Sequence, residues 1–168
     1  AFPCPLISTL NTTYILKDCN SQPADQALGY IVQGKSFSYA SCNRHGSWGH
    51  NESDLVVENG VINGSVYFVQ DAQKVNCFLV NAKTDGKVVL YVIDANAQGL
   101  SINPDSIVDL TRDQATLVFN NVAVEASQLV ASAAESLNAL ATATAAWLVL
   151  LSADMCGAAE WQLQTTAE

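Results

Sequence analysis

"ENGVINGSVYFVQDAQ", residues 58–73, contains two Asn-Gly pairs and then continues as a β-prone apolar run. An Asn-Gly pair between such runs is a strong hairpin signal, because a type I′ turn needs positive φ at both central residues and Asn and Gly tolerate it. Asn59-Gly60 therefore predicts the turn of a β-hairpin. Asn63-Gly64 follows too soon for a second hairpin, so it predicts a bulge at which the strand bends before it continues to Val69.

Strand signals extend on both sides of this hairpin, from Ser36 to about Val124. Stretches rich in β-branched and aromatic residues are separated by turn residues such as Thr84-Asp85-Gly86. Six or seven strands at this spacing predict an antiparallel β-barrel or sandwich. The predicted strands are SFSYASC (36–42), DLVVE (54–58), VINGSVYFV (61–69), VNCFLVNA (75–82), KVVLYVID (87–94) and QATLVFNNV (114–122).

Residues 1–34 predict two short helices. The first runs from Leu6 to about Lys17. The second is opened by Ser21 and Pro23 and closed by Gly34, a combination typical of a helix start and stop.

A single long helix is predicted from about Ser132 to Glu168, where the chain has no proline and one glycine. Its centre, ALATATAAWLVLLSA (139–153), is apolar nearly all the way round but shorter than the roughly 20 residues that span a membrane. Because Asp154 follows directly, we expect burial among other helices and no membrane span. The chain offers no such partner helices, so we expect it to be incomplete, with its last helix cut off or awaiting a partner. The predicted fold class is α+β, an antiparallel β-barrel or sandwich flanked by short N-terminal helices and one long C-terminal helix of an incomplete bundle.

Charge and cysteine usage limit the function classes. The formal net charge is −9, with no basic stripe, so a phosphate backbone would be repelled and no nucleic-acid partner is expected. No C-x-x-C pair is present, and with only His45 and His50 to assist, no metal site is predicted. We interpret the odd number of scattered cysteines as reduced thiols in a cytoplasmic protein: Cys4, Cys19, Cys42, Cys77 and Cys156.

A secreted protein is the alternative interpretation, because three formal glycosylation sequons begin at Asn11, Asn51 and Asn63. Such triplets arise often by chance. The first residues, AFPCPLISTL, have no basic start and no long apolar run, so no signal peptide is predicted.

Taken in order, several stretches resemble the acyl-CoA dehydrogenases, flavin enzymes that desaturate acyl thioesters. Each motif alone is weak, but the series covers nearly the whole chain in the family's order and spacing. The matching stretches are PCPLISTLNTTYILKDC (3–19), GYIVQGKSFSYASC (29–42), ENGVINGSVYFVQDAQKVNCFLVNAK (58–83), YVIDANAQGLSI (91–102) with LVFNNVAV (117–124), and SADMCGAAEWQLQTTAE (152–168).

The resemblance implies three segments: the end of an N-terminal helical domain (1–34), a middle β domain (35–126) and the first helix of a C-terminal helical domain (127–168). In the family, FAD lies between the β domain and the C-terminal bundle, and the acyl-CoA substrate enters beside it. The catalytic glutamate and an arginine of the family lie further along the C-terminal domain than this chain extends. No catalytic residue is therefore predicted within it.

The resemblance also implies the cofactor contacts. Tyr39, Ser41 and Cys42 match the family's first flavin strand, with Cys42 in place of a threonine and Asn43 in place of a glutamate. A thiol is a weak donor, so a contact through Cys42 would be poorer. An equally weighted interpretation is that these are plain strand residues.

Two further stretches supply the remaining implied contacts. Phe68 and Gln70 match the second flavin strand, where the family has tryptophan and threonine. Trp48 lies in the loop that approaches the thioester and is the predicted substrate contact. His45 and His50 flank that loop, and solvated histidines are the simpler interpretation.

Three functional hypotheses follow. The first is part of a working FAD-dependent acyl-CoA dehydrogenase of fatty acid or lipid metabolism, which acts on CH–CH groups. The second is a degenerate, non-catalytic subunit of a heteromeric relative. The third is an unrelated secreted β-rich binding domain. A helix apolar around most of its circumference also predicts a homo- or hetero-oligomer formed through that helix.

Overall fold

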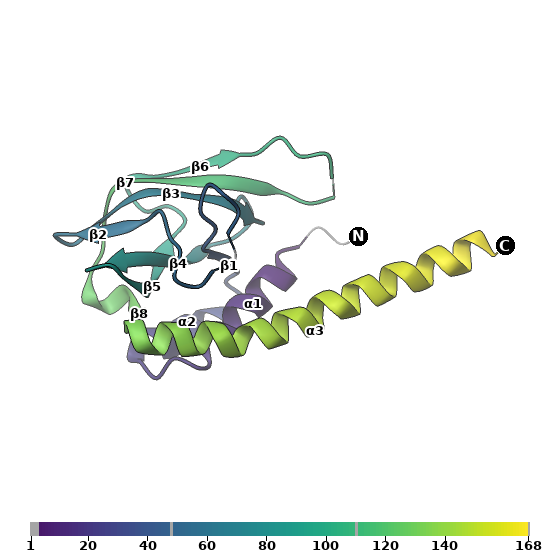
Figure 1. The fold of residues 1–168 in the computed structure, drawn as a ribbon, viewed down its shortest axis with the longest axis horizontal. Coiled ribbons are helices and arrows are strands. Elements are labelled where there is room, and N and C mark those ends of the chain that lie inside the picture. Colours follow the sequence, from purple (N-terminus) through teal and green to yellow (C-terminus); the bar gives the residue numbers. More distant parts are fainter. Residues whose placement is uncertain (1–3, 48, 110, 168) are drawn as a thin grey trace.

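The computed structural model describes residues 4–47, 49–109 and 111–167. Trp48, the predicted substrate contact, lies outside the described residues. Two helices, a β-rich middle part and one long helix follow one another along the chain (Figure 1). The elements are α1 (Leu6–Leu16), α2 (Gln22–Val32), β1 (Phe37–Ala40), β2 (Val56–Glu58), β3 (Val61–Gln70), β4 (Cys77–Thr84), β5 (Lys87–Asp94), β6 (Leu100–Pro104), β7 (Gln114–Ala123), the 3-10 turn η1 (Ala126–Gln128), β8 (Leu129–Ala131) and α3 (Ala133–Thr166).

The predicted hairpin is confirmed. β2 and β3 pair antiparallel, and the turn between them has φ of 50° at Asn59 and 76° at Gly60. Both central residues thus have the positive φ of a type I′ turn.

The predicted bulge at Asn63-Gly64 is also confirmed, because the register of β3 against β7 shifts between Ile62 and Gly64. Gly64 has φ of 124°, and a Cβ built there would overlap the backbone carbonyl oxygen of Asp54. Only glycine therefore permits this close approach.

The eight strands form one strongly bent sheet in the order β6-β7-β3-β2-β4-β5-β8, with β1 paired to β4. The α+β class is confirmed, but two details of the expectation are corrected. The described strands do not close into a barrel, because β6 and β8 end the order. The sheet is also not wholly antiparallel, since β1 and β2 each run parallel to β4.

All six predicted strands are present, but the sequence did not indicate β6 and β8. β6 reads LSINP and pairs only with β7, so its polar, proline-ended sequence suits an edge strand and carries little strand signal. β8 has three residues between η1 and α3 and forms by pairing with β5.

The bent sheet separates two hydrophobic cores. One lies inside the bend, where Phe78 of β4, Leu117 of β7 and Ile62 of β3 are fully buried. The other lies between the outer face of β4 and β5 and the three helices, where Leu79, Leu90 and Leu140 are buried. Figure 1 shows the resulting layers, with β6, β7 and β3 uppermost, β4 and β5 beneath them and the helices at the bottom.

The helices agree with their sequence signals. Ser21 caps α2 by accepting a hydrogen bond from the backbone N–H of Ala24 at 3.2 Å, and Pro23 lies in its first turn. At the start of α3, the side chain of Glu135 accepts hydrogen bonds from the Ser132 hydroxyl at 2.7 Å and from the Ser132 backbone N–H at 3.1 Å.

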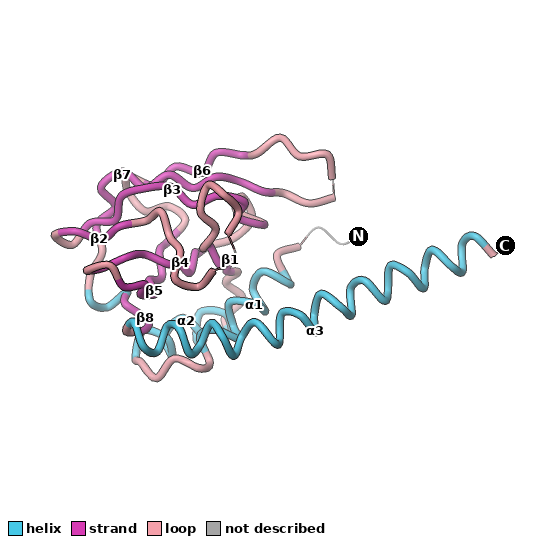
Figure 2. The backbone as a smooth tube through the Cα atoms, viewed as in Figure 1, coloured by secondary structure: helices cyan, strands magenta, loops and turns pink. Residues whose placement is uncertain are grey.

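α3 packs only along its first half. Ser136, Ala139, Leu140 and Ala143 are buried against α1 and the sheet, whereas every residue from 151 to 167 is exposed. Figure 2 shows this second half extending past the rest of the molecule. Over the described residues, α3 is the one helix long and apolar enough to cross a membrane by length and composition. Its most apolar stretch has a mean hydropathy of 1.6, and 17% of that stretch is buried. A single such helix is weak evidence for a membrane span.

The five cysteines form no disulfide within the chain. The sequon at Asn11 lies within α1, where Thr12 is fully buried, so this triplet is not a surface-loop acceptor.

Candidate functional site

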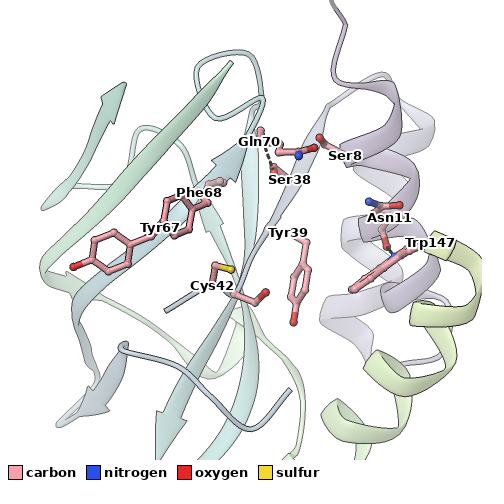
Figure 3. Close-up of a pocket in the computed structure, with 11 residues that line it drawn as sticks. Ser8, Asn11, Ser38, Tyr39, Cys42, Tyr67, Phe68, Gln70 and Trp147 are labelled. Atoms are coloured by element: carbon pink, nitrogen blue, oxygen red, sulfur yellow. Dashed lines mark hydrogen bonds between the residues drawn. The ribbon is translucent and has the colours of Figure 1, made fainter. Parts of the chain in front are cut away.

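A cavity of about 200 Å³ lies between the sheet and the helices. Figure 3 shows its two sides, with strands on the left and α1 and α3 on the right. All five predicted cofactor contacts line it, although they come from separate segments of the chain: Tyr39, Ser41, Cys42, Phe68 and Gln70. The strand side of the cavity is called the sheet wall below. It consists of Ser38, Tyr39, Ser41, Cys42, Tyr67, Phe68, Val69 and Gln70. The helix wall consists of Ser8, Asn11 and Trp147.

The sheet wall bends at a second bulge in β3 that the sequence did not reveal. The register of β3 against β7 shifts between Val66 and Val69, and Phe68 within this shift has φ of 57°. Positive φ is rare and strained for a large residue, and such strain concentrates at functional sites. Phe68 is 49% exposed and lines the cavity.

The bulge is joined to the chain segment that follows β1. The backbone N–H of Tyr67 donates to the carbonyl oxygen of Cys42 at 3.0 Å. The hydroxyl of Ser38, which is 1% exposed, donates to the backbone carbonyl of Gln70 at 2.7 Å. Both contacts hold β1 and β3 together beneath the cavity, whereas the Gln70 side chain is exposed. Ser38 was missed because a lone strand serine carries no recognisable signal.

Tyr39 connects the two walls. Its hydroxyl donates to Oδ1 of the fully buried Asn81 at 2.9 Å. Burial raises the pKa of Tyr39 well above its ordinary value of 10.0, so the phenol stays neutral at physiological pH. Its ring faces Trp147, with ring centroids 5.4 Å apart and planes inclined by 41°.

Cys42 and Asn43 use their side chains to shape the following loop. The Cys42 thiol donates to the carbonyl oxygen of Ser47 at 3.5 Å, and burial raises its pKa. Oδ1 of Asn43 accepts from the backbone N–H groups of His45 and Ser47, both at 3.0 Å, while Nδ2 donates to Glu52 at 2.9 Å. Asn43, which matches the position of the family's glutamate, is only 8% exposed. Its side chain therefore holds the loop in place through these hydrogen bonds.

The two loop histidines make different contacts. His50 Nε2 lies 3.1 Å from the hydroxyl of Thr144 on α3. The same hydroxyl donates to the carbonyl of Leu140 at 2.8 Å. His45 Nε2 accepts from Arg44 at 3.1 Å. Among the residues that the structure describes, no group of three or more His, Cys, Asp or Glu side chains could hold a metal ion.

The helix wall was not predicted from the sequence. The hydroxyl of Ser8 donates to Asp71 at 2.6 Å, and Nε1 of Trp147 donates to the backbone carbonyl of Asn11 at 3.1 Å. The side-chain Oδ1 of Asn11 is buried and has no hydrogen-bond partner among the described residues. The apolar run around Trp147 was the available signal, but nothing local in it indicates which strand or helix the indole meets.

The sequence matches no protein-family model and no curated protein. Solved structures do match the fold. The acyl-CoA dehydrogenase from Geobacillus kaustophilus aligns at 18% identity with a TM-score of 0.66, covering 77% of this chain and 38% of that one. The butyryl-CoA dehydrogenase from Megasphaera elsdenii aligns at 14% identity and a TM-score of 0.65, covering 84% and 43%. PigA with FAD and proline aligns at 19% identity and a TM-score of 0.70, covering 82% and 40%.

The chain thus spans 38–43% of the length of these solved structures. At such low identity the likeness concerns the fold alone. The resemblance to acyl-CoA dehydrogenases is therefore confirmed as a shared arrangement of short helices, bent sheet and long helix over most of the chain.

Proposed function

We propose that the chain is part of an FAD-dependent acyl-CoA dehydrogenase, an oxidoreductase that introduces an α,β double bond into an acyl-CoA thioester. The chain would supply the β-domain wall of the flavin and substrate site. The observation that carries the proposal is the convergence of Tyr39, Ser41, Cys42, Phe68 and Gln70 on one cavity. Likeness to structures that contain FAD or FADH2 supports it at the level of the fold.

The cavity residues fit the ring part of a flavin. Phe68 offers an exposed aromatic face, on which a flat ring system can pack. The exposed Gln70 amide has both a donor and an acceptor for the polar edge of such a ring. The described lining residues include no lysine or arginine, so the diphosphate of FAD would need charge partners elsewhere. The volume of about 200 Å³ also falls below the roughly 300–1,000 Å³ of complete ligand pockets.

When bound, FAD would accept a hydride from the β-carbon of the acyl group. The residues of this chain would position the ring and exclude water from one of its faces. Phe68 would pack on the ring, Gln70 and Ser41 would offer hydrogen bonds to its polar atoms, and Tyr39 would join the ring side to the helix wall. The carboxylate that removes the α-proton is proposed to come from outside this chain.

The same proposal assigns residues 1–34, 35–126 and 127–168 to an N-terminal helical, a middle β and a C-terminal helical domain. β8 begins after the second boundary and still pairs with β5, so the sheet would extend slightly into the third segment. The exposed half of α3 would be covered in a homo- or hetero-oligomer rather than span a membrane. The protein would act in the cytoplasm.

A degenerate subunit of a heteromeric enzyme is the second candidate. The observation that favours it is the use of Cys42 and Asn43 as loop organisers, since both side chains are occupied within the protein. The ChsE4–ChsE5 complex from Mycobacterium tuberculosis, a complex of this fold, aligns with a TM-score of 0.64. The secreted binding domain has no comparable support.

Purification of the full-length protein tests both candidates. A flavin absorbance band that an acyl-CoA bleaches, in the absence of other subunits, is expected for a working dehydrogenase. A protein without that band after supplementation with FAD would contradict the first candidate. Turnover of an acyl-CoA by the isolated protein would contradict the second.

A further inference from the structure

The two Asn-Gly pairs of the β2–β3 region, Asn59-Gly60 and Asn63-Gly64, share the same chemistry but differ in their surroundings. In an Asn-Gly pair, the backbone nitrogen of glycine can attack Cγ of the asparagine side chain. The attack closes a cyclic imide and releases ammonia, and water then opens the imide to aspartate or isoaspartate. Glycine favours the reaction because it has no Cβ to hinder the approach. In a folded protein, the rate depends on how freely the carboxamide and the glycine nitrogen can meet.

The first pair has few constraints. Asn59 is exposed at the tip of the hairpin, and its carboxamide makes no hydrogen bond to the residues that the structure describes. The carbonyl of Gly60 accepts from the N–H of Val124 at 2.9 Å, but the N–H of Gly60, the attacking group, has no backbone partner in the described part of the chain. Figure 1 shows this turn, beside the label β2, projecting at the left edge of the sheet. Rotation within the turn brings the two groups together without breaking any hydrogen bond of the Asn59 side chain.

The second pair is held in place, although Asn63 is exposed as well. Oδ1 of Asn63 accepts from the backbone N–H of Asn121 at 2.8 Å, and Nδ2 donates to Oδ1 of Asn121 at 3.3 Å. Gly64 is paired with Phe119 in the β3–β7 ladder, and a Cβ built on it would overlap the Asp54 carbonyl oxygen. Attack by the Gly64 nitrogen therefore requires that both side-chain hydrogen bonds break and that the backbone of β3 shifts.

From this contrast we infer that Asn59 is a site of spontaneous deamidation in the folded protein, whereas Asn63 is protected. A bond forms between the Gly60 nitrogen and Cγ of Asn59, the Cγ–Nδ2 bond breaks, and the proton of the Gly60 nitrogen leaves with the ammonia. Water opens the imide, so water is the only other reactant and nothing is oxidised or reduced. The inference is independent of the proposed function.

Both products change the hairpin. Each adds a negative charge beside Glu58, on a chain whose formal net charge is already −9. The isoaspartyl product also adds a methylene group to the main chain inside the turn between the paired residues Glu58 and Val61. Because the geometry of such a turn sets the register of its strands, the β2–β3 pairing should weaken. β2 lies between β3 and β4 in the sheet, so the change acts where the bent sheet is joined.

Incubation of the full-length protein at mildly alkaline pH tests the inference. Samples are digested with pepsin at acidic pH, where the imide forms slowly, and electron-transfer fragmentation of the peptides locates aspartate and isoaspartate. Asn59 should convert at least about 10-fold faster than Asn63, as for two hydrogen bonds that must break first. In guanidinium chloride, where neither environment persists, the two rates should agree within about 3-fold.

A pair of variants supplies a second measurement. Asn59→Gln should remove most of the isoaspartate formed in the folded protein, because glutamine forms the corresponding imide far more slowly. Asn138→Gln, at an exposed position on α3, is the matched control and should leave the isoaspartate yield unchanged. If Asn59→Gln does not fold, the comparison of the two asparagines in the natural protein still decides.

Several results would overturn the inference. One is conversion of Asn63 in the folded protein at the rate of Asn59 or faster. Another is an intact Asn59 after a time in which the denatured protein has converted. An unchanged isoaspartate yield in Asn59→Gln would have the same meaning. None of these results bears on the proposed function, which the flavin absorbance band tests separately.

Discussion

The indole Nε1 of Trp147 donates a hydrogen bond to the backbone carbonyl of Asn11 at 3.1 Å, across 136 positions of sequence. The contact joins α3 to α1, and the same indole ring faces Tyr39 on β1. Trp147 thereby links the two walls of the candidate site.

Trp147→Phe should lower the free energy of unfolding by about 1 kcal/mol, because it keeps an aromatic ring against Tyr39 but removes the hydrogen bond to Asn11. Urea denaturation measures the change. Trp161→Phe, at a position 66% exposed, is the control and should alter stability by less than about 0.5 kcal/mol. Equal effects of the two substitutions would show that the indole contact does not stabilise the fold.

Gly64→Ala should destabilise the protein by more than about 2 kcal/mol, because the added Cβ meets the Asp54 carbonyl and φ is 124°. Gly29→Ala is the matched control, since it lies in α2 with no atom within 4 Å of the new Cβ. There, a gain of up to about 1 kcal/mol is expected from helix propensity. Thermal or urea unfolding of both variants distinguishes these outcomes, and a neutral Gly64→Ala would contradict the close approach.

Phe68→Gly should weaken flavin binding while leaving the free energy of unfolding nearly unchanged. Glycine relieves the positive φ of 57°, so the free energy of unfolding should change by less than about 1 kcal/mol despite the lost ring. Flavin affinity should fall roughly 2- to 10-fold, as for one aromatic contact, and Phe68→Trp should restore or raise it. Titration of the apoprotein with FAD, followed by flavin fluorescence, gives these affinities. Unchanged affinity in Phe68→Gly would exclude Phe68 from the flavin wall.

The start of α3 should lose stability in acid. Hydrogen bonds from Ser132 hold the pKa of Glu135 below its ordinary value of 4.5. The pKa of Glu135 is lower in the folded protein than in the unfolded chain. The ionised carboxylate therefore stabilises the fold fully above pH 4.5, and this stabilisation is lost as the pH falls through the pKa of Glu135 in the folded protein. The stability difference between the natural protein and Glu135→Gln should therefore shrink as the pH is lowered below 4.5, which urea titrations across that range would reveal. A difference independent of pH would contradict the capping contact.

Cysteine alkylation should report on the proposed oligomer. Burial raises the pKa of Cys19 and Cys77 to about 11, so both should react slowly at neutral pH. Cys156 is exposed on α3 within a single chain. If an oligomer covers that part of α3, Cys156 should be protected at high protein concentration and react faster on dilution. Mass spectrometry of the labelled peptides would show this, and a rate independent of concentration would count against coverage by a dissociable partner.

Local chemistry explains what could be predicted from the sequence. Asn59-Gly60 and Asn63-Gly64 set the hairpin and the first bulge, because their φ requirements depend on the adjacent backbone alone. The helix limits likewise followed from nearby capping residues such as Ser21. The resemblance to acyl-CoA dehydrogenases also identified five residues that share one cavity, although their contact with a flavin stays a prediction.

The tertiary structure decided features that depend on distant partners. The strands β6 and β8 exist through pairing with β7 and β5, and the bulge at Phe68 depends on the register of β3 against β7. Ser8, Asn11 and Trp147 form the helix wall only because packing brings α1 and α3 together. The sequence by itself therefore determined the turns, the helices and most strands, while long-range packing determined the shape and polarity of the site.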